Sequence, residues 1–234
     1  TPGRAVQSVA QSSFDTWTKY YRPDENTPNA TVSYYTKGAL VAMALDLTLR
    51  REGKGNLDAV MQRLWTQSGG GPITEADIAA ALQAVGKRSY AKELAAWVHG
   101  KGELPLAELL GELGVSWTQD KPTLGQRLGA RTAESNGSLK VQAALRGGAA
   151  EQAGLAAGDE LIALDGWRLK KLDDLGALRA FEQPLPLLAA RDGRLLQLTL
   201  PTTTGSAQGT VSLASDEKAK RAVQQRRASW LACG

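Results

Sequence analysis

The stretch AGLAAGDELIALDG, residues 153–166, decides how the second half of the chain is expected to fold. The pair Gly158-Asp159 predicts a tight turn, and Glu160–Leu164 is a short apolar run typical of a strand. The pair Asp165-Gly166 predicts a second turn that leads out of this strand. A strand held between two short turns indicates a small β-rich domain.

The neighbouring sequence extends this prediction in both directions. Further strands are expected at Val141–Leu145 and Leu195–Leu200, and the pairs Gly147-Gly148 and Asp192-Gly193 predict turns. A helix is predicted at Asp173–Phe181. Together these elements suit a domain of about 80 residues.

This domain is expected to cover residues 119–202. The segment Thr202–Ser215 is rich in Thr, Ser, Gly and Ala, which is typical of a linker. Asp216 is a suitable N-cap for a last helix that runs to about Ala232. Residues 203–234 are therefore predicted to be a linker and a C-terminal helix.

Residues 1–118 carry helical patterns. Apolar side chains recur at helical spacing between Ser33 and Glu52, and the glycines that follow end this helix. Four further helices are predicted from their starting residues, which are Asn56, Thr74 with Asp77 as its capping-box acid, Ser89 and Pro105. The predicted fold class is α+β, with an N-terminal helical bundle segment, a small β-rich domain and a C-terminal helix.

The composition excludes several classes of protein. One cysteine, Cys233, and one histidine, His99, cannot form a disulfide framework or a self-contained zinc centre. His99 lies at a predicted helix end, where a structural role is favoured over a metal role. The basic run Lys218–Arg227 lacks interleaved aromatic residues, so no nucleic-acid partner is expected. No apolar run approaches the ~20 residues of a membrane span, so no membrane partner is expected.

The second half resembles a PDZ domain of the bacterial, permuted type. The resemblance rests on Leu128-Gly129-Ala130-Arg131, on Gly147-Gly148-Ala149-Ala150 and above all on residues 153–166. A PDZ domain implies that an extended peptide is added as a strand to a sheet edge, beside a helix.

This resemblance implies a groove between an edge strand at Leu128–Thr132 and the helix at Asp173–Phe181. The candidate peptide-binding residues lie on both walls and are Leu128, Gly129, Ala130, Leu175 and Leu178. Backbone amides of residues 124–129 are candidates for binding a terminal carboxylate, although the preceding loop departs from the usual Gly-Leu-Gly-Phe pattern. The alternative is a scaffold role, in which the protein itself occupies the groove.

The first half is similar to the glycyl-aminopeptidase family of gluzincin metallopeptidases, as bacteria have them. The matching motifs are YYRPDEN at 20–26, Pro28-Asn29, SYYTKG at 33–38, WVHG at 97–100 and ELPL at 103–106. The order of the domains, a helical segment followed by a PDZ domain, also matches this family. The resemblance implies that the parent protein is a zinc aminopeptidase that removes small N-terminal residues such as Gly and Ala.

In that family, zinc is held by two histidines of an H-E-x-x-H helix and a later Glu, and the motif's own Glu is the general base. This sequence contains no H-E-x-x-H, so the resemblance places the zinc ligands upstream of Thr1. Zinc is implied for the longer parent and none for this chain, which is expected to be inactive alone. The start is not a signal peptide, so any export signal would also lie upstream, and both cytoplasm and periplasm stay open.

The resemblance assigns one catalytic residue to this chain. Tyr35, by its place in Tyr-Thr-Lys-Gly, would donate a hydrogen bond to the oxyanion of the tetrahedral intermediate. Tyr34 is the competing candidate, and the alternative is that both tyrosines only cap a core. Gly38 suggests the close approach of another backbone, and Lys37 is expected to be exposed or paired with a carboxylate of the missing part.

Three accounts of the whole chain remain open at this point. The first is the C-terminal part of a zinc aminopeptidase, whose partners are a peptide at the PDZ groove and the upstream zinc-bearing half. The second is a non-enzymatic PDZ-containing binding or scaffold protein. The third is a chain cleaved from its parent, with exposed apolar surface that the zinc-bearing half or a homo-oligomer would cover.

Overall fold

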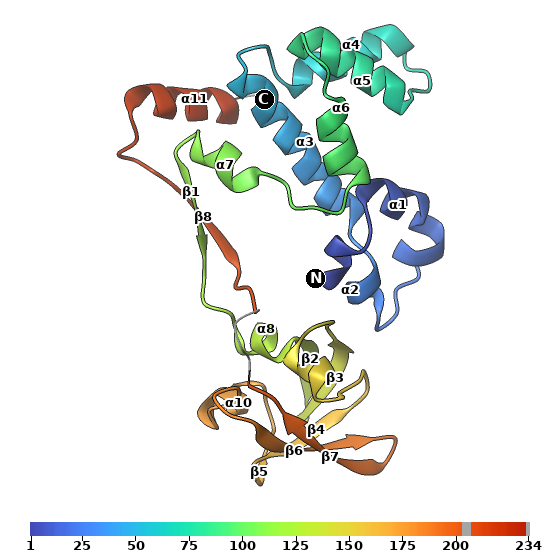
Figure 1. Ribbon diagram of the computed structural model, residues 1–234, viewed down its shortest axis with the longest axis vertical. Coiled ribbons are helices and arrows are strands. Elements are labelled where there is room, and N and C mark those ends of the chain that lie inside the picture. Colours follow the sequence, from blue (N-terminus) through green and yellow to red (C-terminus); the bar gives the residue numbers. More distant parts are fainter. Residues whose placement is uncertain (203–206, 233–234) are drawn as a thin grey trace. The chain divides into compact units, whose positions relative to one another are not determined.

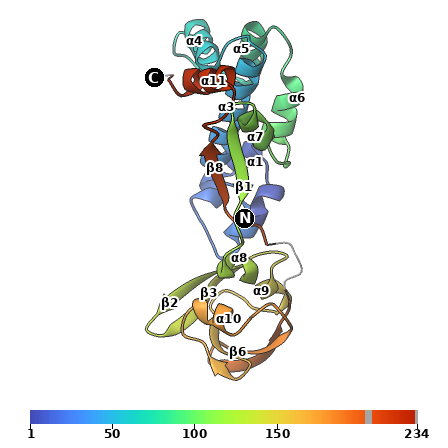
Figure 2. The ribbon, with the colours of Figure 1, turned by 90° about the vertical axis from the view of Figure 1, so that its left-hand side faces the viewer.

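The computed structural model describes residues 1–202 and 207–232, and Figures 1 and 2 show it from two sides. The chain forms two compact units. The helical unit comprises residues 4–20, 32–117 and 213–234, and the β unit comprises residues 1–3, 21–31 and 118–212. Within the described ranges, no helix combines the length and apolarity needed to cross a membrane. The observed architecture is α+β, as predicted, with N-terminal helices, a sheet and a C-terminal helix.

The helical unit is built around α3, the long helix in blue near the middle of this unit in Figure 1. Its bounds, Tyr34–Arg51, agree with the helix predicted between Ser33 and Glu52, and Ser33 is its N-cap. The helices that follow α3 are α4 (Leu57–Ser68), α5 (Glu75–Gly86), α6 (Ala91–Leu94), the π-helical turn η3 (Ala95–His99), α7 (Leu106–Gly111) and the C-terminal α11 (Arg221–Leu231). The predicted caps Asn56 and Thr74 are confirmed, the latter with its Asp77 capping box.

The structure corrects the predicted helices at three places. Four short elements precede α3, namely η1 (Pro2–Ala5), α1 (Val9–Phe14), η2 (Thr16–Tyr20) and α2 (Thr27–Ala30). The helix expected to begin at Ser89 is a short α-helix, capped by Tyr90, that continues as a π-turn. The last helix begins at Arg221, because Asp216 accepts from the Lys218 N–H in a preceding turn instead of capping the helix.

The β unit contains an antiparallel sheet in the order β2-β3-β4-β6-β7, with β5 paired to β4. The strands are β2 (Ala130–Ser135), β3 (Ser138–Ala144), β4 (Glu160–Leu164), β5 (Trp167–Arg168), β6 (Leu185–Arg191) and β7 (Arg194–Leu200). The short helices of this unit are α8 (Leu124–Leu128), α9 (Ala149–Gln152) and α10 (Asp173–Ala177). The predicted turns Asp165-Gly166 and Asp192-Gly193 are confirmed, with both residues of each pair at positive φ.

The predicted linker is partly a strand. Within it, β8 (Val211–Ser215) pairs with β1 (Val115–Gln119), which was not predicted. The pairing carries side-chain hydrogen bonds as well, because the hydroxyls of Ser116 and Thr118 donate to the carbonyls of Ala214 and Ser212 at 3.1 and 3.2 Å. Figure 2 shows the two strands side by side. Residues 203–206 of the predicted linker, and Cys233, lie outside the described residues.

The stretch at residues 153–166 supplies much of the β unit's core. Leu155, Leu161 and Leu164 are buried in one cluster with Leu139, Val141 and Leu187 of the neighbouring strands. The fully buried carboxylate of Asp159 accepts two hydrogen bonds from Arg191, at 2.7 and 2.8 Å, and one from the N–H of Ala156 at 2.9 Å. The Asp of the Gly-Asp turn therefore ties the loop before β4 to the end of β6.

Candidate functional site

The predicted site residue Tyr35 lies in the first turn of α3, in a cluster of three tyrosines. The ring of Tyr34 lies 4.3 Å from that of Tyr35 and 5.1 Å from that of Tyr20, centre to centre, and Tyr20 lies 6.0 Å from Tyr35. The hydroxyls of Tyr20 and Ser33 lie 3.2 Å apart, and Ser33 also accepts from the Thr36 N–H. Sequence reasoning missed Tyr20, although its place in Tyr20-Tyr21 resembles the second tyrosine pair.

Buried polar side chains fix the backbone just before this cluster. The hydroxyl of Ser12 donates to the carbonyl of Val32 at 2.5 Å, and the N–H of Val32 donates to the Gln7 side chain at 3.2 Å. The Gln7 amide donates to Asp15 at 3.1 Å. A hydrogen bond from Lys19 holds the pKa of Asp15 below its usual value, so this carboxylate is charged near neutral pH. The start of α3 is therefore set by α1 and the residues around it.

The tyrosines differ in exposure. Tyr34 is half-buried, whereas 58 % of Tyr35 is exposed. A side chain packed on one flank and exposed on the other can direct its hydroxyl at a ligand. Lys37 is half-buried and its ammonium lies 3.5 Å from the carbonyl of Arg4. At Gly38 an added Cβ would have open space around it among the described residues, so the expected close approach of another backbone is not found.

Metal ligands were not expected in this chain. In the described part, no group of three His, Cys, Asp or Glu side chains is arranged to hold a metal ion. Nε2 of His99 lies 2.8 and 2.9 Å from the two carboxylate oxygens of Glu75, a contact between the end of η3 and the start of α5. The residues described here therefore do not form a zinc site.

The predicted peptide-binding residues lie in or beside the β unit's core. Leu128 and Leu175 are fully buried, Ala130 is buried, and Leu178 is half-buried against them. Gly129 has φ +66°, and a Cβ there would collide with the backbone of Gly148, so this glycine serves the packing of two loops.

The walls of the predicted groove also differ from expectation. Leu128 is the last residue of α8, and the edge strand begins only at Ala130. The helical wall ends at Ala177, and Arg179 and Phe181 beyond it have positive φ. Amides proposed to bind a carboxylate are used within α8, because Gln126, Arg127 and Gly129 donate to Thr123 and Gly125.

The edge of the sheet at β2 is nevertheless open to pairing. Among the described residues, β2 pairs with β3 alone. At the N-terminal end of α10, the carboxylate of Glu134 accepts from the Leu172 N–H at 2.8 Å. Near the C-terminal end, the Arg127 guanidinium stacks over the Phe181 ring at 4.9 Å. These contacts hold α10 close to α8 and β2.

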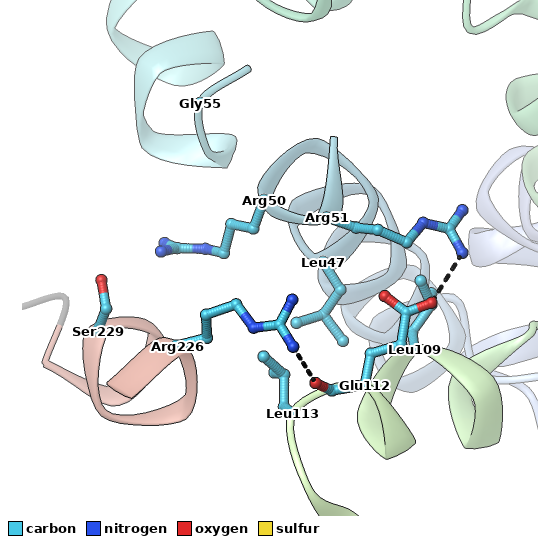
Figure 3. Close-up of a pocket in the computed structure, with 9 residues that line it drawn as sticks. All are labelled: Leu47, Arg50, Arg51, Gly55, Leu109, Glu112, Leu113, Arg226 and Ser229. Atoms are coloured by element: carbon cyan, nitrogen blue, oxygen red, sulfur yellow. Dashed lines mark hydrogen bonds and ion pairs between the residues drawn. The ribbon is translucent and has the colours of Figure 1, made fainter. Parts of the chain in front are cut away.

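A separate cavity of about 230 Å³ lies in the helical unit between α3, α7 and α11. Figure 3 shows its apolar floor of Leu47, Leu109 and Leu113, with arginines above it. These cations already have partners: Arg51 pairs with Glu108 at 2.9 Å, Arg50 pairs with Asp46 at 2.8 Å, and Arg226 donates to the Glu112 carbonyl at 3.3 Å. The cavity is therefore described best as the junction of three helices.

Comparisons with known proteins were made for the whole chain. The family model of the M61 glycyl aminopeptidases matches residues 1–41, and no curated protein matches. An aminopeptidase N family protein from Idiomarina loihiensis is 28 % identical with a TM-score of 0.84, over 98 % of this chain and 41 % of that one. The HtrA3 PDZ domain bound to a phage-derived ligand is 16 % identical with a TM-score of 0.29, over 43 % of this chain and 92 % of that one.

The chain thus spans less than half the length of the aminopeptidase N family protein that it matches. Its first 41 residues, which contain the tyrosine cluster, are similar to the M61 glycyl aminopeptidases. Nearly all of it shares the fold of part of an aminopeptidase N family protein.

Proposed function

We propose that this chain is the rear part of a zinc-dependent aminopeptidase of the glycyl-aminopeptidase type, which removes small N-terminal residues such as Gly and Ala. The observation that carries the proposal is the match of residues 1–41 to the M61 family, since this range contains the tyrosine cluster and the start of α3. The structural match to an aminopeptidase N family protein supports it. The β unit is proposed to be a PDZ module.

Exposed aromatic side chains in the helical unit support the proposal that another part of the parent protein covers this surface. Phe14 and Trp17, three residues apart at the end of α1 and the start of η2, are 90 % and 78 % exposed. Large aromatic side chains are costly to leave in water, and a pair of them suggests a surface that another part of a protein covers. The proposed occupant is the zinc-bearing half of the parent protein.

The proposed catalytic contribution of this chain is the hydroxyl of Tyr35. When water adds to the carbonyl carbon of a peptide bond, the carbonyl oxygen becomes negatively charged. A neutral phenol that donates a hydrogen bond to this oxygen stabilises the charge without its own proton being transferred. The hydrogen-bonded start of α3 and the contact with the Tyr34 ring restrict where Tyr35 can point, which is the pre-organisation that such a donor needs.

Zinc is proposed for the parent protein and not for this chain alone. Bound zinc would supply an activated water in such an enzyme. The described residues hold no ligand set for it, so the ligands are proposed to lie in the upstream half. We expect this chain by itself to hydrolyse no peptides.

A direct experiment compares glycine 4-nitroanilide hydrolysis by this chain and by the longer protein that contains it, both with zinc added. Activity in the longer protein alone agrees with the proposal. Activity in this chain alone would mean that it builds a metal site by itself, and no activity in either would contradict the aminopeptidase assignment.

The second candidate is a non-enzymatic binding or scaffold protein, and the open edge of β2 favours it. A bound peptide would extend the sheet along Arg131 and Thr132, and the half-buried Leu178 is the predicted apolar contact on the side of α10. An NMR titration with a short peptide would distinguish the candidates, because strand addition would shift the amide signals of β2.

A further inference from the structure

Segment 21–31 belongs to the β unit although both chain neighbours of the segment belong to the helical unit. Its most buried residues are Pro28 and Asn29, and 7 % of Asn29 is exposed. The carboxamide of Asn29 donates to the carbonyl of Ala144 at 2.8 Å and accepts from the N–H of Arg146 at 2.9 Å. These partners are 115 and 117 residues away in the sequence.

This pair of bonds has the form of strand pairing. The C=O of residue 144 and the N–H of residue 146 are the two groups that an extended chain presents on one side to a neighbouring strand. An Asn side chain is chemically a primary amide, so it can replace the peptide group that a further strand would offer. Asn29 thus satisfies the backbone just beyond the end of β3.

Hydrogen bonds within the segment itself hold its conformation. The hydroxyl of Thr27 donates to the Asp24 carboxylate at 3.0 Å and accepts from the Asp24 N–H at 2.7 Å, and Asp24 also accepts from the Asn26 N–H. Pro28 lies in the first turn of α2, where its fixed φ suits a helix. Such ordering lowers the entropy lost when Asn29 binds.

The second contact of the segment is with the N-terminus of the chain. Gly3 is buried, and a Cβ at this position would collide with the backbone of Thr31. Two residues near the C-terminal end of the short helix α2 are therefore held by different partners, Asn29 by the β3 loop and Thr31 by residues 1–3.

We infer that the β unit binds the chain's own segment 21–31, and that the side chain of Asn29 is the recognition element of this intramolecular site. On this account the partner of the β unit is an internal, pre-folded turn, and the site is the backbone of residues 144–146. The inference does not require the proposed aminopeptidase activity.

Amide hydrogen exchange of the full chain, measured by NMR, tests this inference. In Asn29→Ala, the exchange of the Arg146 amide and of the amides of residues 27 and 29–31 is expected to accelerate about tenfold or more. Amides in the middle of the sheet, such as Leu161, should exchange at the original rate. The matched control is Glu25→Ala, an exposed residue of the same segment, which should change none of these rates.

Asn29→Asp provides a second, isosteric test that also serves if the alanine variant folds poorly. A carboxylate can still accept from the Arg146 N–H but cannot donate to Ala144, so Arg146 should stay protected while the amides of residues 27 and 29–31 exchange faster. Unchanged exchange in both variants would overturn the inference. In Asn29→Ala, an acceleration at Arg146 no greater than at Leu161 would also overturn it, because that would show general destabilisation in place of a released contact.

Discussion

At the scale of single residues, the pairing of Asp159 with Arg191 ties the loop before β4 to the end of β6. The Asp159 carboxylate is fully buried and accepts hydrogen bonds from Arg191 and from the Ala156 N–H. Arg191 also donates to the Gly154 carbonyl at 2.7 Å. Replacing the buried carboxylate by an amide removes its charge and turns one of its two acceptor oxygens into a donor, which opposes the N–H groups of Arg191 or Ala156.

Asp159→Asn is therefore expected to lower the free energy of unfolding by about 3 kcal/mol. Urea unfolding followed by circular dichroism measures the change. Asp192→Asn is the matched control, because Asp192 is exposed in the next turn and Asn tolerates its positive φ of 50°. Its effect should stay within about 0.5 kcal/mol, and equal losses in the two variants would contradict the role of Asp159.

The same carboxylate predicts a dependence of stability on pH. Burial alone would raise the pKa of Asp159, but the hydrogen bonds from Arg191 and Ala156 outweigh it and hold the pKa below its usual value. A lowered folded-state pKa stabilises the protein above the unfolded pKa of about 4, and this contribution is lost as pH falls through the folded pKa. The difference in unfolding free energy between the original protein and Asp159→Asn should therefore be constant near neutral pH and shrink below about pH 4. A difference that stays constant on acidification would refute this.

At the scale of elements, the C-terminal helix α11 is attached to the helical unit through a buried cation. The guanidinium of Arg227 donates to the carbonyls of Gly114, Asp216 and Leu113 at 2.8, 3.2 and 3.4 Å. Trp230, one turn further along the helix, packs against the cluster formed by α3 and α7. The basic character of this segment thus serves partly to bind backbone oxygens, in addition to forming an exposed face.

Arg227→Ala is expected to weaken the attachment of α11 to the helical unit while the rest of this unit stays folded. The substitution removes a charged donor that makes hydrogen bonds to three backbone carbonyls, which costs about 2 kcal/mol. The amides of α11 are expected to exchange faster, while those of α3 stay protected. The exposed Arg221 provides the control, since Arg221→Ala removes the same charge from the same helix. If both substitutions accelerated the exchange of the α11 amides equally, the loss of positive charge would explain the result, and the role assigned to the hydrogen bonds of Arg227 would be contradicted.

The elements also show what sequence patterns can and cannot predict. Helix caps are local, so the caps Asn56 and Thr74 were found from the sequence, as was the start of α3 near Ser33. The helix α8 was missed although Thr123 and Gln126 form a capping box at the expected spacing, a signal that could have revealed it. The strands β1 and β8 are largely exposed and belong to distant segments, so neither alternation nor burial marks them.

At the scale of the whole molecule, the two units are built from interleaved segments of the chain. A boundary near residue 118 was predicted from the sequence, because the spacing of apolar residues changes there from helical to strand-like. It did not predict that segment 21–31 belongs with the sheet, because the bonds of Asn29 join residues more than 100 positions apart. Of the three tyrosines in the cluster, the sequence singled out Tyr35 as the catalytic candidate and Tyr34 as its competitor but not Tyr20, and the role of Tyr35 stays a prediction.

The measurement that tests the central claim most directly is the steady-state kinetics of Tyr35→Phe in the longer protein, with glycine 4-nitroanilide and zinc. Loss of one hydrogen-bond donor to the oxyanion is expected to lower kcat by about 10²–10³-fold and to change KM little. Tyr21→Phe, outside the cluster, should keep the original kcat. An unchanged kcat in Tyr35→Phe, or the same loss in Tyr34→Phe alone, would contradict the role assigned to Tyr35.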